Sequence, residues 1–241
     1  MKTLGVIGGL GPEATVEYYH TIITLYRERK PDGSYPQFFI NSVDLSKGLA
    51  LITANDLAGV TKYLLEEIEK LAKAGADFGL IAANTPHIVF DDVQKESSLP
   101  LLSIVEATAV AAKARGLKRL GLFGTRFTTQ AKFYPAVFSK AGIELVVPDL
   151  EDQEYIHDKY LNELVPGKFL PETRENLLAI VDRLRAKIDP PSQSYGAAGI
   201  DGVILAGTEL PLILREPAHN GVPFLDTTKI HSEAAVTEML S

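Results

Sequence analysis

Short, uninterrupted apolar runs that end abruptly in small and polar residues and a proline occur twice along the chain. One run is 78–83, within the stretch 77–87, and the other is 203–206, within the stretch 200–211. Runs that are apolar on both faces are typical of strands buried in a parallel sheet. In open α/β sheets ligands bind beyond the carboxyl ends of the strands, so the residues that end each run are candidates for chemistry.

Strand patterns alternate with helical patterns through the rest of the chain. We expect further strands over 3–7, 37–43, 101–105, 119–123, 143–147 and 222–226. Apolar residues three or four positions apart predict helices over 12–29, 57–74, 88–95, 106–114, 150–165 and 172–187, and a terminal helix after residue 228. Thr128 or Thr129 is expected to cap one more helix, and 189–196 is expected to be a surface loop. The alternation predicts an α/β fold with parallel sheets.

The two central runs belong to halves that repeat one plan, offset by about 120 residues. The opening segment 4–9 has an echo at 120–125, and 99–103 has one at 222–226. We therefore expect two similar α/β domains. The chain is expected to cross between them near residue 106 and to return near residue 211. Residues 1–106 with 212–241 would then form the first domain, and residues 107–211 the second.

The composition narrows the class of protein and of partner. The 241 residues are 46% hydrophobic and 23% charged, which is typical of a soluble globular protein. A net charge of −7 without a run of Lys or Arg argues against nucleic acid and anionic membranes as partners. The chain opens directly on a strand pattern and has no apolar run of membrane-spanning length, so we expect a cytoplasmic protein. It contains no cysteine, which excludes disulfides, zinc–thiolate sites and thiol catalysis.

A glycine-rich turn follows the first strand. Residues 9–14 fit a relaxed G-x-G-x-x-A pattern, which favours nucleotide binding in some folds. The acidic residue that ends the next strand, Asp44, lies about 30 positions on, whereas a dinucleotide site expects about 20. We favour a turn that brings the backbone of Gly9 close to a small ligand or to another loop. No cofactor is expected.

The polar residues that end the two runs each have two interpretations. Asn84 and Thr85 suit the cap of the following helix, and amides and hydroxyls at a strand end also hold carboxylates. His87 is either a structural, helix-capping histidine or a catalytic one. Glu209 is either a solvated acid at a helix start or a catalytic group. The five histidines do not form the paired pattern of a zinc-binding helix, so no metal site is expected.

Four motifs together carry a resemblance to a known family. Residues 7–15 (Ile-Gly-Gly-Leu-Gly-Pro-Glu-Ala-Thr), 83–87 (Ala-Asn-Thr-Pro-His), 124–125 (Gly-Thr) and 207–211 (Gly-Thr-Glu-Leu-Pro) resemble the aspartate/glutamate racemase family, closest to its aspartate racemase branch. The likeness runs nearly end to end. It implies two α/β domains related by a pseudo-twofold axis, an active site in the cleft between them, and often a homodimer. It also implies cofactor-independent chemistry on a small dicarboxylic amino acid.

The chain departs from this family where the chemistry is expected. The family's two cysteines, which remove and return the α-proton, correspond to Ala83 and Gly207, whose side chains cannot take a proton. The binding residues that the resemblance implies are retained. Those expected to hold the α-carboxylate and the amine are Asn84, Thr85, Thr125 and Thr208. The lysines expected near the distal carboxylate are Lys47 and either Lys159 or Lys168.

The sequence therefore predicts a racemase-family enzyme that moves the α-proton of a small dicarboxylic amino acid with groups other than thiols. His87 and Glu209 are the titratable side chains of the two motifs, one in each half, so they are the candidates for this proton transfer. Two alternatives stay open. One is a lyase or a different isomerase on the same scaffold that uses a single base. The other is a small-carboxylate-binding protein that has lost catalysis.

Overall fold

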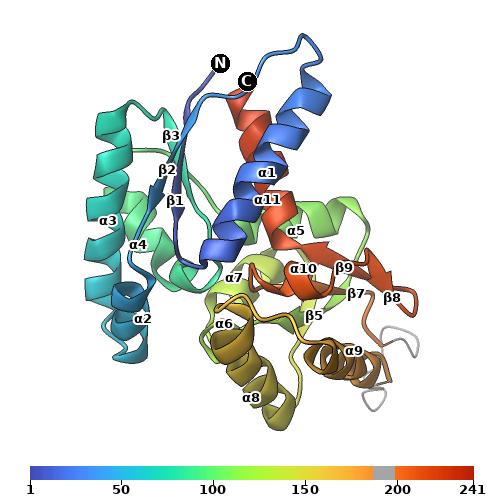
Figure 1. The fold of residues 1–241 in the computed structure, drawn as a ribbon. Helices are drawn as coiled ribbons and strands as arrows, with labels where there is room; N and C mark the ends of the chain where they lie inside the picture. The colour runs from blue at the N-terminus through green and yellow to red at the C-terminus, as the bar shows by residue number, and fades with distance from the viewer. Residues whose placement is uncertain (187–198) are drawn as a thin grey trace. The chain divides into compact units, whose positions relative to one another are not determined.

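The computed structural model describes residues 1–186 and 199–241 and divides the chain into two compact units (Figure 1). Unit 1 is Met1–Ala107 with Thr228–Ser241, and unit 2 is Thr108–Thr227. The expected loop at 189–196 lies outside the described residues. Each unit is built on a sheet of mainly parallel strands with helices packed against it.

Unit 1 holds a sheet of four parallel strands in the order β2-β1-β3-β4. The strands are β1 (Leu4–Gly8), β2 (Phe38–Ser42), β3 (Phe78–Ile81) and β4 (Leu101–Leu102). The residues of β1 and β3 are buried along their whole length, because these strands lie in the middle of the sheet and helices cover both faces. The uninterrupted apolar runs in the sequence follow from this burial.

The helices of unit 1 cover opposite faces of that sheet. They are α1 (Pro12–Arg29), α2 (Leu45–Thr53), α3 (Leu57–Ala74), a 3₁₀-helix (Thr85–Val89), α4 (Phe90–Glu96) and α11 (Thr227–Met239). Helix α5 (Ile104–Ala114) begins in unit 1, which ends at Ala107, and continues into unit 2. In Figure 1, α1 and α11 lie on one face of the sheet and α3 lies on the other. Tyr18 of α1, Leu80 of β3 and Val236 of α11 belong to one buried cluster, so the final helix completes a core begun by the first strand.

Unit 2 holds a sheet in the order β6-β5-β7-β9-β8, parallel except for β8. Its strands are β5 (Arg119–Phe123), β6 (Glu144–Val146), β7 (Gly202–Leu205), β8 (Ala218–His219) and β9 (Val222–Asp226). Its helices are α6 (Arg126–Thr129), α7 (Phe133–Lys140), α8 (Leu150–Lys159), a π-helix (Tyr160–Leu164), α9 (Pro171–Ala186) and α10 (Leu210–Ile213). Helices α8 and α9 lie side by side, joined by an ion pair between Arg183 and Asp152.

The two sheets repeat one strand order. In chain order, β5, β6, β7 and β9 of unit 2 correspond to β1, β2, β3 and β4 of unit 1. In both sheets the second of these strands lies at one edge and is followed across the sheet by the first, the third and the fourth. Strand β8 is an addition to unit 2. The α/β fold with two parallel-sheet domains, expected from the sequence, is confirmed.

One expected boundary is corrected by the pairing of β9. The chain was expected to return to the first domain at residue 212, but it remains in unit 2 through Thr227. The reason is that β9 pairs with β7, with Ile204 opposite Leu225, so the last strand of the second half belongs to its own sheet. The return is made by α11, which begins directly after β9.

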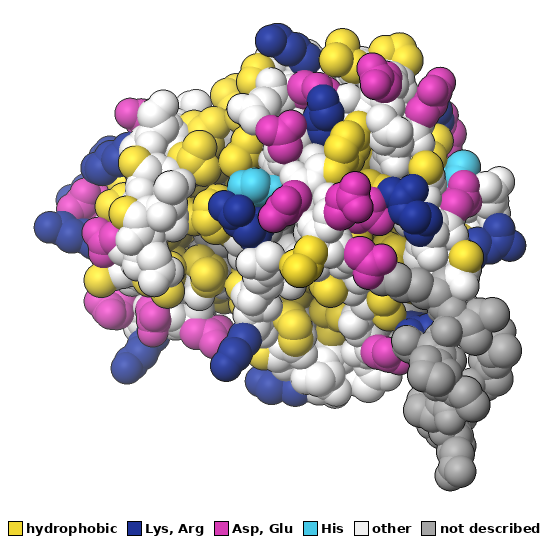
Figure 2. Space-filling model, turned by 90° about the horizontal axis from the view of Figure 1, so that it is seen from below, with side chains coloured by type: hydrophobic (Ala, Val, Ile, Leu, Met, Phe, Trp, Pro, Cys, Tyr) yellow, Lys and Arg dark blue, Asp and Glu magenta, His cyan; other side chains and the backbone are white. Residues whose placement is uncertain are grey.

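Within the described ranges, none of the helices combines the length and apolarity needed to cross a membrane. On the face shown in Figure 2, acidic and basic side chains are interspersed over the surface.

Candidate functional site at the ends of β3 and β7

The residues that end the two apolar runs lie inside the protein rather than on loops at its surface. Ala83 and Asn84 follow β3 and are buried, as is His87 in the 3₁₀-helix, while Thr85 is half-buried. In unit 2, Gly207, Thr208 and Glu209 follow β7 and are all buried. Because β3 and β7 are interior strands of their sheets, these clusters stand where an open α/β sheet places ligands.

His87 is held by backbone groups on both sides of its ring. Its Nδ1 lies 2.9 Å from the carbonyl oxygen of Ala83, and its Nε2 accepts the N–H of Ile104 at 3.2 Å. The ring also stacks on Phe90, with 4.9 Å between the centroids. Since Nε2 accepts a proton donor, the proton of the neutral ring is on Nδ1 and points at a carbonyl. His87 therefore ties the end of β3 to the start of α5.

The electrostatic environment keeps His87 uncharged. Burial lowers its pKa to about 3, with a further contribution from His231. His231 is also buried, and its pKa is lowered to about 4. It lies between the Tyr18 hydroxyl, 2.9 Å from Nδ1, and the Leu102 carbonyl, 3.1 Å from Nε2. These contacts favour the structural interpretation of His87, and its catalytic role stays a prediction.

Gly9 has a structural reason for being glycine. Its φ is +79°, and a Cβ there would lie 2.5 Å from the carbonyl oxygen of Val43. The turn therefore approaches another loop closely, which is one of the two alternatives expected from the sequence. The N–H of Gly9 donates to the Thr15 hydroxyl at 2.8 Å. Substrate binding by Gly9 stays a prediction.

Glu209 is buried completely, which excludes the solvated-acid interpretation. Its Oε2 accepts hydrogen bonds from the Tyr160 hydroxyl and, at 3.1 Å, from the Thr208 hydroxyl. Thr208 itself is 1% exposed. A carboxylate is thus held by two hydroxyl donors just beyond a strand end, an arrangement that fixes the orientation of a proton-accepting group.

Tyr160 is a residue of this cluster that the sequence did not reveal. It is 8% exposed and opens the π-helix after α8. A Cβ built on Gly207 would lie 2.4 Å from its Cε2 and 3.0 Å from its Cζ. Burial, and next the charge of Glu209, raise the Tyr160 pKa well above its ordinary value, so the phenol stays neutral. Tyr160 lies 47 positions before Gly207, and no sequence pattern joins the two residues.

Thr125 stands beyond the neighbouring strand β5, as the matched strand order requires. It is buried and precedes α6, with its carbonyl accepting the N–H groups of Thr128 and Thr129 at 2.8 and 3.0 Å. The capping position is therefore Thr125, not Thr128 or Thr129 as expected, because α6 begins at Arg126.

The three candidate lysines have different surroundings. Lys159 forms an ion pair with Glu163, which also accepts the Thr173 hydroxyl. The hydrogen bond from Lys159 is the largest cause that lowers the Glu163 pKa, and the charge of the exposed Lys168 is a smaller one. Lys47 is exposed, with its Nζ 4.4 Å from the centre of the Tyr63 ring. Distal-carboxylate binding by these lysines stays a prediction.

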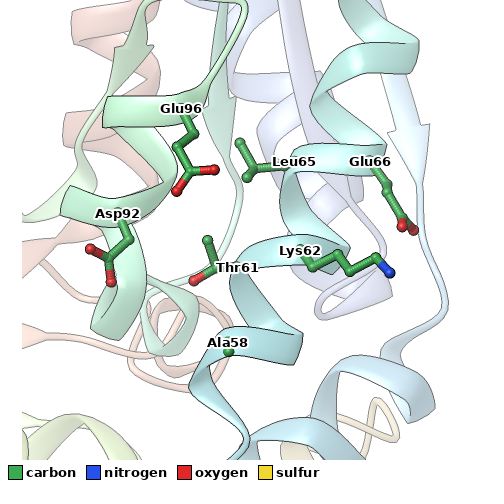
Figure 3. Close-up of a pocket in the computed structure, with 7 residues that line it drawn as sticks. All are labelled: Ala58, Thr61, Lys62, Leu65, Glu66, Asp92 and Glu96. Carbon is green, nitrogen blue, oxygen red and sulfur yellow. The ribbon is translucent and has the colours of Figure 1, made fainter.

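A surface groove of about 500 Å³ lies between α3 and α4 of unit 1 (Figure 3). Glu96 extends from α4 toward the side of α3 that carries Thr61 and Leu65, and Asp92 of α4 also lines the groove. None of the candidate residues lines it. Across residues 1–186 and 199–241, no three His, Asp or Glu side chains gather as a metal ion would require.

Comparison with known proteins agrees with the fold and with the motifs. The broad specificity amino-acid racemase RacX of Bacillus subtilis is 24% identical over 241 residues, covering 99% of this chain and 98% of its own. A candidate Asp/Glu racemase from Yersinia pestis has a crystal structure with a TM-score of 0.84 at 31% identity. The crystal structure of an aspartate racemase homologue from Pyrococcus horikoshii has a TM-score of 0.80 at 33% identity. Both structural matches cover 100% of each chain.

The sequence features of the family described as Asp/Glu/hydantoin racemase match residues 7–235. This span includes both strand-end clusters and Tyr160. By this match, and by two full-length structural likenesses above 30% identity, the chain belongs to the Asp/Glu/hydantoin racemase family.

Proposed function

We propose that this protein acts on a small dicarboxylic amino acid such as aspartate or glutamate, moving its α-proton without a thiol or a cofactor. Glu209 is the group that takes the proton. The observation that carries this proposal is the buried Glu209 carboxylate, two residues beyond Gly207 and oriented by the hydroxyls of Tyr160 and Thr208. Membership in the racemase family and the similarity to a broad specificity amino-acid racemase support the substrate class.

The chemistry follows from the weakness of the α-proton as an acid. Glu209 removes the proton from Cα, and the electron pair of the C–H bond passes into the α-carboxylate, which becomes an enediolate. Donors at the strand ends stabilise the developing charge, and Glu209 then returns the proton. The side chains proposed as these donors are Asn84, Thr85, Thr125 and Thr208. A correctly placed base contributes roughly 10²–10⁴-fold to such a step.

We expect proton transfer to take place on only one face of the substrate Cα. His87 is neutral, and both of its ring nitrogens are engaged by backbone groups, so it competes poorly for an α-proton. Ala83 has no proton-accepting group. Exchange of the α-proton with solvent is therefore expected to run faster than inversion of configuration, because inversion needs a proton donor on the opposite face.

The test is to incubate L-aspartate and L-glutamate with the protein in heavy water. Magnetic resonance measures deuterium at Cα, and chiral chromatography measures the D-enantiomer. We expect exchange to exceed inversion, and Glu209→Gln to slow exchange by about 10²-fold or more. Glu216→Gln, which alters an exposed carboxylate of the same unit, is the control and should leave exchange unchanged. Equal exchange rates in wild type and Glu209→Gln would disprove the role of Glu209.

The second candidate function is a carboxylate-binding protein without turnover, and the engaged ring of His87 favours it. Calorimetry with aspartate, glutamate, malate and citrate, repeated with a chelator, separates the two. Binding without any α-proton exchange establishes the second candidate. Binding of none of the four acids, or binding lost in the chelator, contradicts both.

A further inference from the structure

We propose that Tyr160 is the positioning residue of this site: its hydroxyl fixes the Glu209 carboxylate, and its ring fills the space beside residue 207, where it admits only glycine. The role in catalysis rests on the proposed function, whereas the coupling of Tyr160 with Gly207 and Glu209 is tested without it. Three observations carry the inference, namely the local helix geometry, the hydroxyl contact and the space beside Gly207.

A change of helix type begins at Tyr160. Helix α8 ends at Lys159, and the following turn is a π-helix in which the N–H of Val165 donates to the Tyr160 carbonyl at 2.9 Å. A π-turn inserts one extra residue and re-aims the side chains that follow, and such turns are frequent at functional sites. The ring then enters the core cluster of unit 2 with Phe123, Leu205 and Leu210. This packing leaves the ring little freedom to move.

The hydroxyl of Tyr160 acts on Glu209 as a donor at any physiological pH, because burial keeps the phenol protonated. Thr208 supplies a second donor to the same oxygen, Oε2. Two fixed donors on one oxygen restrict rotation of the carboxylate. We expect the fixed orientation of the base to raise kcat more than it changes substrate affinity, because a small misplacement of the base weakens proton transfer.

The requirement for glycine at 207 comes from the ring of Tyr160 and not from the backbone. The φ of Gly207 is not positive, so the backbone at this position is one that alanine can also adopt. The obstacle is the Tyr160 ring, which a new Cβ would approach to 2.4 Å. Removing the ring should therefore make alanine acceptable at 207.

The first experiment measures positioning. In Tyr160→Phe the ring stays and the hydroxyl is lost, so we expect kcat for α-proton exchange to fall by about 10-fold or more with KM nearly unchanged. The acidic limb of the pH–rate profile should move to higher pH, because a donor to the charged carboxylate is gone. Tyr155→Phe, five positions earlier and on α8, is the matched control. An unchanged kcat and pH profile in Tyr160→Phe would overturn the positioning role and leave the proposed function intact.

The second experiment needs no activity. Gly207→Ala should lower Tm by roughly 5 °C in the wild type but by little in Tyr160→Ala, because overpacking vanishes with the ring. Gly48→Ala, where the new Cβ meets Leu10 at an ordinary 3.5 Å, is the control and should not lower Tm. Tyr160→Phe and Glu209→Gln should likewise lower Tm less together than the sum of their separate effects.

The two experiments separate the possible failures. If the wild type exchanges no proton, the proposed function fails, and the two Tm cycles alone decide whether Tyr160 is coupled to Gly207 and Glu209. If Gly207→Ala is equally harmful with and without Tyr160, or if Tyr160→Phe and Glu209→Gln are additive, the coupling is overturned.

Discussion

Ala83 and Gly207 differ in how readily each could accept a thiol. Ala83 already carries a Cβ, so Ala83→Cys adds a single sulfur. Gly207→Cys would place both a Cβ and a sulfur in the space of the Tyr160 ring. We therefore expect that two substitutions do not suffice to restore two working thiols, and that a third, Tyr160→Ala, is needed to make room at residue 207.

This difference predicts the outcome of restoring the thiols. Ala83→Cys with Gly207→Cys should fold poorly and racemise aspartate no faster than the wild type. With Tyr160→Ala added, inversion should exceed that of either single-cysteine variant carrying Tyr160→Ala, because each thiol serves one face. Chiral chromatography after incubation with L-aspartate is the measurement. A triple variant that binds aspartate and inverts none of it would mean that residues 83 and 207 do not flank Cα.

His87 and His231 make the stability of the protein sensitive to acid. Their pKa values are lowered to about 3 and about 4 in the folded state, below the ordinary 6.5. The unfolded chain therefore binds more protons below pH 6.5, and the stability that these histidines provide is complete above that pH. It is lost as the pH falls from 6.5 toward 4, by about 1.4 kcal/mol per pH unit for each histidine.

Urea unfolding at pH 7 and pH 5 tests this pH dependence. The free energy of unfolding should fall between the two, and His231→Gln should make that fall smaller. His20→Gln, on the exposed part of α1, should not change it. The same slope in His231→Gln as in the wild type would mean that His231 is not held neutral.

At the scale of single elements, the helices and strands that the sequence predicted correctly were those whose ends are set by contacts between residues close together in the chain. Helix α3 was bounded correctly because Asp56 caps it by accepting the Gly59 N–H at 2.9 Å, and Gly75 ends it with φ +99°. Helix α2 was missed, although Asp44 caps it by accepting the Ser46 N–H at 2.9 Å. The strand expected over 101–105 is paired only at Leu101–Leu102, since α5 begins at Ile104.

Contacts between residues far apart in the chain could not be predicted from the sequence. The bond from Ile104 to His87 joins residues 17 positions apart, and that from Tyr160 to Glu209 joins residues 49 apart. The sequence therefore predicted the residues at the strand ends, because their place follows from the order of strands and helices alone. It left open what His87 does, and it did not find Tyr160.

At the scale of the molecule, unit 1 is made of two separated segments of chain. Ala235, Val236 and Met239 of α11 are fully buried in its core, and His231 accepts the Tyr18 hydroxyl. Burying three such side chains contributes several kcal/mol, at about 1.5–3 kcal/mol for each large one. That is a large part of the roughly 5–15 kcal/mol by which a domain is stable.

Ending the chain after Thr227 should therefore unfold unit 1 and spare unit 2. We expect limited proteolysis of this variant to cut within residues 1–107 and to leave a resistant fragment near 108–227. The full chain under the same conditions is the control. Resistance of residues 1–107 in the shortened chain would show that α11 is dispensable for this core.

The place of α11 also reverses the usual order of folding during synthesis. Residues 1–107 leave the ribosome first, yet the apolar surface around Tyr18 and Leu80 is not covered until α11 emerges. At roughly 5–20 residues per second, translation of the intervening unit takes on the order of ten seconds. Unit 2, one continuous segment, can close before unit 1, so the nascent first segment must be kept from aggregating while it waits for the last helix.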